Sequence, residues 1–295
     1  MKEIRFAKKS DIPKLKEIWK ICFGDDDDYI DFFFKNKYKE EETLLSLCDG
    51  EIAAMLTMIP TKIVMPDNSS LKASMIYAVA THPKYRGKGL SSKLMEYSNN
   101  YLLNNNVDAS ILVPATESLF KFYSRQGYME GFYLREVVLT DENIKGFERI
   151  TNTQCLIVSA TPEEYNKRRE NLLQGKLYVA YGDEEIAYQK ALSKYSGADI
   201  YAIDIEDIRG CAIVERINSE KVIIKELLIP EKLLKDGIIQ ITKSLPAKEY
   251  ILRLPSYLGE DFGGVIRAFG MIHLHRRIDE KVVTNTSGYM GLAYD

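Results

Sequence analysis

The sequence predicts a mixed α/β fold in two similar halves, at residues 1–145 and 153–295. Apolar residues recur at helical spacing in some segments and as short strand-like runs in others, which is the pattern of a mixed fold. The order of these segments in the first half returns in outline in the second. A chain of 295 residues with 45% hydrophobic side chains is long enough to bury two cores.

The first half opens with a short strand and two helices. The alternating run at residues 4–6 predicts the strand, and apolar residues at helical spacing predict a helix that Gly24 ends. The run Asp25–Asp28 begins the second helix, where carboxylates suit the positive end of the helix dipole. These carboxylates could also attract a polycationic amine by electrostatic steering, but we favour the solvated helix N-terminus.

Antiparallel strands come next. Two apolar runs flank Asp49–Gly50, a dipeptide typical of tight hairpin turns. A second turn, at residues 65–68, leads into a long strand over residues 71–80. The later elements of this half are predicted as a helix that begins at Leu90, a strand over residues 109–113 and a helix over residues 117–125. The polar stretch 143–153 marks the boundary between the halves.

The second half repeats this order. A hairpin pattern covers residues 200–215, a strand over residues 222–229 ends before Pro230, and a helix follows over residues 233–245. The run 250–255 then resembles the strand and proline of residues 110–114. We therefore interpret the chain as two copies of one fold.

The loop between residues 81 and 90 has the clearest chemical signal. Gly87 and Gly89 let the backbone approach a ligand closely, and the amides that start the next helix form a positive concavity suited to a pyrophosphate. Arg86 and Lys88 could add positive charge. A Gly-x-Gly before a helix can also be an ordinary turn, and the order of elements around it favours the binding interpretation. A P-loop is excluded because its longer Gly-x-x-x-x-Gly-Lys-Ser/Thr spacing is absent.

These residues resemble a known family. Arg86-Gly87-Lys88-Gly89-Leu90, directly after a strand that ends Ala78-Val79-Ala80, is similar to the R/Q-x-x-G-x-G/A acetyl-CoA signature of the GNAT (GCN5-related) N-acetyltransferases. Phe122-Tyr123-Ser124-Arg125-Gln126-Gly127-Tyr128 resembles the later F-Y-x-x-x-G-F/Y segment of that family. The tandem arrangement is similar to the enhanced-intracellular-survival type of GNAT protein, without room for the third domain common there.

The resemblance implies a fold and a set of binding residues. In GNAT enzymes the strand before the loop separates from its neighbour and exposes backbone groups for the pantetheine arm of acetyl-CoA. Here that strand ends with Ala78, Val79 and Ala80. The resemblance places the pyrophosphate on the amides of Arg86, Gly87, Lys88, Gly89, Leu90 and Ser91, with the hydroxyl of Ser91 or Ser92 as a further donor. Acetyl-CoA is the expected cosubstrate.

The resemblance also implies a catalytic residue. Tyr123 falls where the family often carries a tyrosine that hydrogen-bonds the departing thiolate and can protonate it. A phenol with an ordinary pKa of about 10 suits a thiolate of comparable basicity. The other interpretation of Tyr123 is a core aromatic residue on an amphipathic helix.

The sequence offers no clear general base. Many GNAT members carry a carboxylate on the strand before the loop, but Lys72–Ala80 contains no Asp or Glu. The candidates are Glu117, the run Asp25–Asp28, Tyr77 and the terminal carboxylate at Asp295. A water chain without a dedicated base is equally possible.

The second half lacks the same motifs. The stretch from Pro230 to the following helix contains a single glycine, Gly237, and no R-x-x-G-x-G motif. Ile266 lies four residues before Gly270, whereas Tyr123 lies four before Gly127. We therefore expect residues 153–295 to form a degenerate GNAT-like domain that binds no acetyl-CoA.

A metal site is not expected. His273 and His275 have the alternate spacing of one strand face, but no third ligand is evident. Exposed strand histidines are the better interpretation of this pair.

Taken together, the sequence predicts an acetyl-CoA-dependent N-acetyltransferase that moves an acetyl group to a primary amine of a small molecule or peptide by direct attack on the thioester. Such an enzyme mainly supplies orientation and charge stabilisation. The same fold could instead acetylate a hydroxyl or use a longer acyl-CoA. The alternative from another class is a non-catalytic acyl-CoA-binding sensor or interaction module.

Composition excludes other classes of protein. A net charge of −3 and a pI near 5.8 give no basic excess for nucleic acid or an anionic membrane. No apolar run approaches the ~18–20 residues that cross a bilayer, and the charged first residues are unlike a signal peptide. The four cysteines form no CxxC pair, which favours a reducing cytoplasm.

Overall fold

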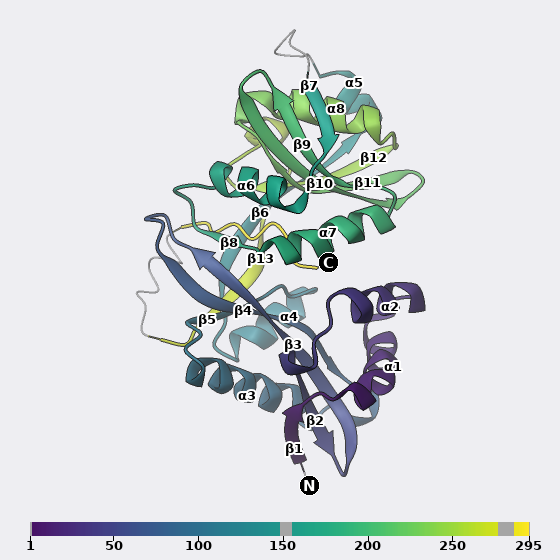
Figure 1. Ribbon diagram of the computed structural model, residues 1–295, viewed down its shortest axis with the longest axis vertical. Coiled ribbons are helices and arrows are strands. Elements are labelled where there is room, and N and C mark those ends of the chain that lie inside the picture. The colour runs from purple at the N-terminus through teal and green to yellow at the C-terminus, as the bar shows by residue number, and fades with distance from the viewer. Residues whose placement is uncertain (1, 148–154, 277–285, 295) are drawn as a thin grey trace. The chain divides into compact units, whose positions relative to one another are not determined.

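The computed structural model describes residues 2–147, 155–276 and 286–294 (Figure 1). The chain divides into two compact units. Within the described residues, the first unit consists of residues 2–62, 71–130 and 270–276, and the second of residues 63–70, 131–147, 155–269 and 286–294. Both units contain helices and strands, which confirms the predicted mixed α/β class.

The first unit follows the predicted order of elements. They are β1 (Lys2–Phe6), η1 (Lys9–Asp11), α1 (Ile12–Phe23), α2 (Asp27–Asn36), η2 (Glu40–Glu42), β2 (Thr43–Cys48), β3 (Glu51–Val64), β4 (Ser70–Thr81), η3 (Pro83–Tyr85), α3 (Leu90–Asn104), β5 (Ala109–Leu112) and α4 (Glu117–Ser124). Gly24 ends α1 in the left-handed conformation, at φ +79°. Asp49 and Gly50 have φ of 53° and 84°, as a type I′ hairpin turn requires.

The sheet of the first unit runs in the order β1, β2, β3, β4, β5. Residues 271–274 of β13 (Val265–Leu274) pair antiparallel with β5 on its other side. Strands β3 and β4 run between α3 and the helices α1 and α2 (Figure 1). One buried cluster includes residues of β2, β3, α3, β5 and α4, with Leu44, Leu56 and Leu94 fully enclosed.

The second unit has a similar order of elements. They are the larger part of β6 (Met129–Thr140), α5 (Asp141–Lys145), β7 (Cys155–Ser159), α6 (Pro162–Leu172), β8 (Tyr178–Ala180), α7 (Asp183–Tyr195), β9 (Ile200–Ile205), β10 (Ile208–Asn218), β11 (Lys221–Leu228), η4 (Glu231–Leu233), α8 (Leu234–Ser244), β12 (Glu249–Pro255), η5 (Glu260–Phe262) and the start of β13. Its sheet runs β6-β12-β11-β10-β9-β7, and α8 lies on the opposite side of it from α6 and α7 (Figure 1).

A buried ion pair lies at the centre of the second unit. Arg169 and Glu226 are both fully buried, and their side chains approach to 2.9 Å. The Tyr165 hydroxyl donates a hydrogen bond of 2.5 Å to the same carboxylate. Arg169 also donates to the carbonyl oxygens of Val179 at 2.8 Å and Met290 at 3.1 Å. The ion pair therefore ties the segment 286–294 to α6 and β11.

Neither unit is a continuous stretch of sequence. Residues 134–140 of β6 pair with β12 inside the second unit, and residues 271–274 of β13 pair with β5 inside the first. The limits 1–145 and 153–295 remain a prediction, and residues 148–154, which cover most of the interval between the two ranges, lie outside the described residues. Gly270 lies inside β13, so the expected equivalence with Gly127, which follows a helix, is wrong.

Candidate active site

Strand β4 separates from its parallel partner at the predicted pantetheine site. The two strands pair only from Ala73–Ala109 to Met75–Ile111, although β4 continues to Thr81. Within the separated part, Ala78 has a φ of +50°, which is rare for a residue with a Cβ. The backbone of residues 78–80 is therefore unpaired toward β5 and is available to hydrogen-bond a ligand.

The loop that follows β4 turns into α3 through two left-handed glycines. Gly87 and Gly89 have φ of 77° and 70°, and Gly89 is the N-cap of α3. A Cβ at either position would meet no atom within 4 Å, so the space in front of both glycines is open. The first-turn amides of a helix have no partner inside the helix. Those of Leu90, Ser91 and Ser92 thus stand at the end of an open loop, in the arrangement that binds phosphate oxygens.

The cationic side chains of the loop have their own contacts. Arg86 donates through Nε to the Thr81 carbonyl oxygen at 3.2 Å and through Nη2 to the Cys22 sulfur at 3.7 Å. The Lys88 ammonium lies 5.2 Å from the centre of the Tyr85 ring. Both residues are exposed. The guanidinium of Arg86 fixes the loop against the end of β4.

The three residues after the glycines differ in their surroundings. Leu90 is 2% exposed and packs in the core of the first unit. Ser92 accepts a hydrogen bond of 3.4 Å from the Gln126 side chain, which links α3 to the segment after α4. Ser91 is partly exposed.

Tyr123 lies near the end of α4. Thr116 caps this helix by accepting from the Leu119 amide at 3.4 Å. The Tyr123 ring is 7% exposed, with the rings of Phe122 and Tyr128 at 5.1 and 6.0 Å. Burial raises the pKa of Tyr123 to about 12. The side chain is thus a protonated phenol at neutral pH, and it belongs to the same buried cluster as Leu90 and Leu94.

A polar network beside Tyr123 was not predicted from the sequence. The Tyr128 hydroxyl lies 2.7 Å from the Ser110 hydroxyl and donates to Asn99 at 3.2 Å. The His273 ring lies 5.3 Å from that of Tyr128, and a Cβ at Gly127 would come within 3.2 Å of it. The alternating Ile-His-Leu-His pattern indicated that both histidines share one face of a strand. It could not indicate that this strand pairs with β5, because the two strands are distant in sequence.

The expected exposure of the two histidines is wrong. His273 and His275 are partly buried, with their rings 5.0 Å apart. Burial lowers the pKa of His273 and, together with its histidine neighbour, lowers that of His275 to about 4. In the described part of the chain no group of three or more His, Cys, Asp or Glu side chains is placed to hold a metal ion.

The acidic run before α2 has local structural partners. Asp25 accepts a hydrogen bond of 2.7 Å from the Trp19 indole, and Asp26 caps α2 through the Tyr29 amide at 2.7 Å. Asp27 forms an ion pair of 2.7 Å with Lys20. These contacts agree with the helix N-terminus that we favoured.

Among the described candidate bases, Glu117 and Tyr77 have different surroundings, and Tyr77 and Asp25 both contact Trp19. Glu117 is exposed and forms an ion pair of 3.1 Å with Lys121. Tyr77 packs in an aromatic cluster, with ring centres 5.5 Å from Phe33 and 5.8 Å from Trp19. Asp295 lies outside the described residues.

A protein-family model matches the first part of the chain. The model for the acetyltransferase (GNAT) domain matches residues 3–131, so this part of the chain is a GNAT acetyltransferase domain. No curated protein sequence matches the chain significantly. No helix in the described ranges is long and apolar enough to cross a membrane.

Three solved structures illustrate the likeness in fold. A GCN5-related N-acetyltransferase from Anabaena variabilis superposes with a TM-score of 0.76 at 15% identity, over 94% of this chain and 73% of its own. Eis1 from Mycobacterium abscessus has a TM-score of 0.68 at 12% identity, over 92% and 74%. A putative acetyltransferase from Pyrococcus horikoshii has a TM-score of 0.58 at 15% identity, over 98% and 94%. Each of these structures thus matches the fold of between 92% and 98% of the chain.

Proposed function

We propose that the first unit is an acetyl-CoA-dependent N-acetyltransferase that moves an acetyl group to a primary amine. The observation that carries the proposal is the continuous run from the separated part of β4, with Ala78 in a left-handed conformation, to the open loop at Gly87 and Gly89. This run offers unpaired backbone groups and then a helix start, which suit an extended ligand that ends in a pyrophosphate.

Each part of the run has a binding role in this proposal. The backbone of Ala78, Val79 and Ala80 would hold the pantetheine arm. The amides from Gly87 to Ser91, with the hydroxyl of Ser91 or Ser92, would hold the pyrophosphate, whereas the expected Arg86 amide donates to the Pro83 carbonyl oxygen at 3.2 Å. The absence of side chains at Gly87 and Gly89 is what leaves room for phosphate oxygens. Acetyl-CoA supplies the activated acetyl group as a thioester, and the protein supplies its orientation relative to the amine.

Tyr123 is the proposed acid. In direct attack, the neutral amine forms a C–N bond to the acetyl carbon, and the C–S bond breaks to give a thiolate. The phenol of Tyr123 gives its proton to that thiolate, the proton lost by the amine passes to water, and the Tyr123 phenolate takes a proton back from water. Tyr123 is protonated across the neutral range, as the acid role requires, although burial makes it a weaker acid than an ordinary phenol. Water is proposed as acceptor because β4 has no carboxylate from Lys72 to Ala80.

For the second unit we propose a GNAT-like fold that binds no acetyl-CoA. Its order of strands and helices supports the fold. The passage from β11 through Pro230 and η4 directly into α8, with Gly237 inside the helix, leaves no glycine loop for a pyrophosphate.

Calorimetry tests the proposal directly. We expect acetyl-CoA to bind the full chain with one site, and thiol to be released when an acceptor amine from a panel of polyamines, amino acids and amine antibiotics is added. Two sites per chain would contradict the assignment of the second unit. Binding without thiol release for any acceptor, including hydroxyl compounds, would favour the acyl-CoA sensor. No binding to the folded chain would overturn both.

A further inference from the structure

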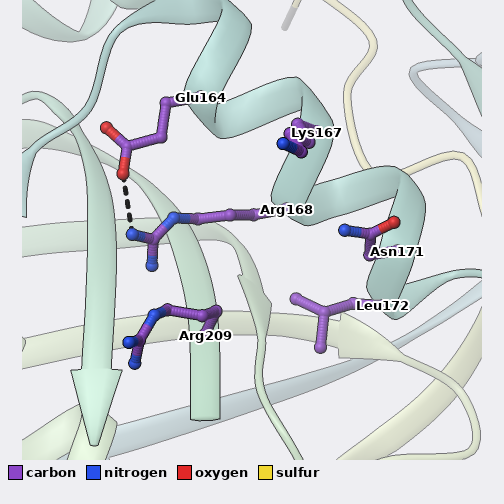
Figure 2. A pocket seen from close by; sticks show the side chains of 6 residues that line it. All are labelled: Glu164, Lys167, Arg168, Asn171, Leu172 and Arg209. Carbon is purple, nitrogen blue, oxygen red and sulfur yellow. Dashed lines mark hydrogen bonds and ion pairs between the residues drawn. The ribbon is translucent and has the colours of Figure 1, made fainter. Parts of the chain in front are cut away.

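A pocket in the second unit is separate from every residue assigned above. Its volume is about 340 Å³, within the range of small-molecule sites. Helix α6 supplies one wall at helical spacing, and Arg209, near the start of β10, supplies another (Figure 2). The lining residues are Glu164, Lys167, Arg168, Asn171, Leu172 and Arg209.

Arg168 forms a fixed floor for the pocket. Its guanidinium donates to Glu164 at 2.7 Å and to Asp204 at 2.5 Å, and also to the carbonyl oxygens of Ile203 and Gly210 at 3.4 and 3.2 Å. Figure 2 shows this side chain extended between Glu164 and Arg209. Because its two terminal nitrogens are engaged, Arg168 positions the pocket and has little capacity left to bind a ligand.

Two other cations keep donors for a ligand. Among the described residues, no hydrogen bond or ion pair engages the ammonium of Lys167, which is exposed. Arg209 donates through Nη1 to the carbonyl oxygens of Glu206 and Ile208, and its Nε lies 3.6 Å from Asp204. In the same part of the chain its Nη2 has no partner, so one edge of the guanidinium is available.

The balance of charge favours an anion. Lys167, Arg168 and Arg209 carry three positive charges, and the carboxylates of Glu164 and Asp204 neutralise two of them. One positive charge remains, together with the amide of Asn171 and the apolar side chain of Leu172. A small ligand with one oxyanion group and an apolar part matches this lining.

We propose that the pocket between α6 and Arg209 binds a small oxyanion, a carboxylate or a phosphate ester. Lys167 and Arg209 hold the oxyanion, Asn171 donates a further hydrogen bond and Leu172 contacts the apolar part. The site consists of second-unit residues alone, so it does not depend on acyl transfer by the first unit.

The test uses the full chain labelled with ¹⁵N and two probes, inorganic phosphate and benzoate, at constant ionic strength. Amide chemical shifts report on binding. We expect saturable shifts around α6 with a Kd on the order of millimolar, as one exposed oxyanion contact provides. Lys167→Met and Arg209→Met should each weaken binding by about tenfold or more. Lys194→Met, at an exposed lysine of α7 that does not line the pocket, should leave the Kd unchanged.

The two probes separate the possible ligand types. Binding of phosphate alone indicates a phosphate ester, and binding of benzoate alone indicates a carboxylate held also by Leu172. Lys167→Gln provides a second variant at an exposed position if Arg209→Met alters the hairpin. Shifts that do not saturate for either probe, or a Kd that stays the same in both Lys167→Met and a folded Arg209→Met, would overturn the proposal.

Discussion

Both units contain a pair of parallel strands that separate, but the backbone that follows the separation differs between them. In each, a parallel strand pair separates before its ends, β4 from β5 after Met75 and β11 from β12 after Ile224. In the first unit the separated strand contains a left-handed alanine and leads to a loop with two left-handed glycines. In the second, β11 has no residue with positive φ and leads through Pro230 into helix.

The space beside the separated strand also differs. Glu226 lies on the separated part of β11 and forms the buried ion pair with Arg169. A Cβ at Gly291 would collide with the Glu226 carboxylate, so the C-terminal segment packs directly against it. The chain itself thus fills this part of the second unit. Strand separation alone does not make a ligand site; the strand must also be left uncovered.

The largest expected effect is the loss of acetyl-CoA affinity when a side chain fills the open space at Gly89. Gly89→Trp places an indole in the space that no atom occupies and removes access to the α3 amides, so acetyl-CoA affinity should fall about 100-fold or more. Gly197→Trp is the matched control, since Gly197 also has a positive φ, of 84°, and open space around it. Calorimetry measures both. An equal loss of affinity in the two variants would mean that backbone strain, rather than the site, is responsible.

Removal of the proposed acid should act on turnover. Tyr123→Phe keeps the buried ring, and we expect turnover to fall by about 10²–10⁴-fold while the Kd for acetyl-CoA stays nearly the same. Tyr97→Phe, at a tyrosine of α3 that is 42% exposed, is the control and should be silent. If Tyr123→Phe turned over normally, Tyr123 would be a core aromatic only.

The dependence of the turnover rate on pH also tests Tyr123 as the acid. Burial holds the pKa of Tyr123 at about 12, above the ordinary value of about 10. The phenol therefore keeps its proton between about pH 8 and about pH 10, and the rate should not decline there through loss of the acid. A fall in rate over that range, absent in Tyr123→Phe, would contradict the raised pKa.

Breaking the buried ion pair of Arg169 and Glu226 in the second unit should lower the free energy of unfolding. Arg169→Met leaves the Glu226 carboxylate buried without its partner, and we expect the free energy of unfolding to fall by about 3–5 kcal/mol. The double variant with Glu226→Leu should regain most of that loss, because neither charge is then buried alone. Urea unfolding and hydrogen exchange of the Val179 amide, which donates to Tyr289, measure the change. A double variant no better than the single one would argue against an uncompensated charge as the cause.

The smallest expected effect is a dependence of stability on pH, which arises from two histidines, one in β13 and one directly after it. The pKa of His275 is about 4 in the folded chain, against about 6.5 when unfolded, and that of His273 is also lowered. Between these values the unfolded chain binds more protons, so stability should decrease as the pH falls from about 6.5 to about 4. Both rings are partly exposed, and Asp108 attracts the charged form of His275. We therefore expect the free energy of unfolding to fall by only about 1 kcal/mol over this pH range.

Urea midpoints measured against pH test this expectation. His275→Gln should flatten the profile between about pH 6.5 and about pH 4. An unchanged slope in His275→Gln would show that other groups dominate the acid response.

Local patterns in the sequence predicted the elements of the first unit well. Asp49–Gly50, Gly24 and Gly89 each determine a turn or a helix end through their own backbone preferences, and all lie where expected. The left-handed Ala78 could not be predicted, because its own side chain disfavours that conformation and the surrounding strands impose it. The pairing of His273 with Ser110 likewise depends on two segments distant in sequence.

The interleaved segments determine when each unit can be finished during synthesis. Strand β5 is made early, but its neighbour Met271 leaves the ribosome only when most of the chain has been translated. Until then one edge of β5 is unpaired and can associate with other strands. The two units are therefore expected to complete folding late and nearly together, and a message truncated before β13 would yield a first unit with an open edge.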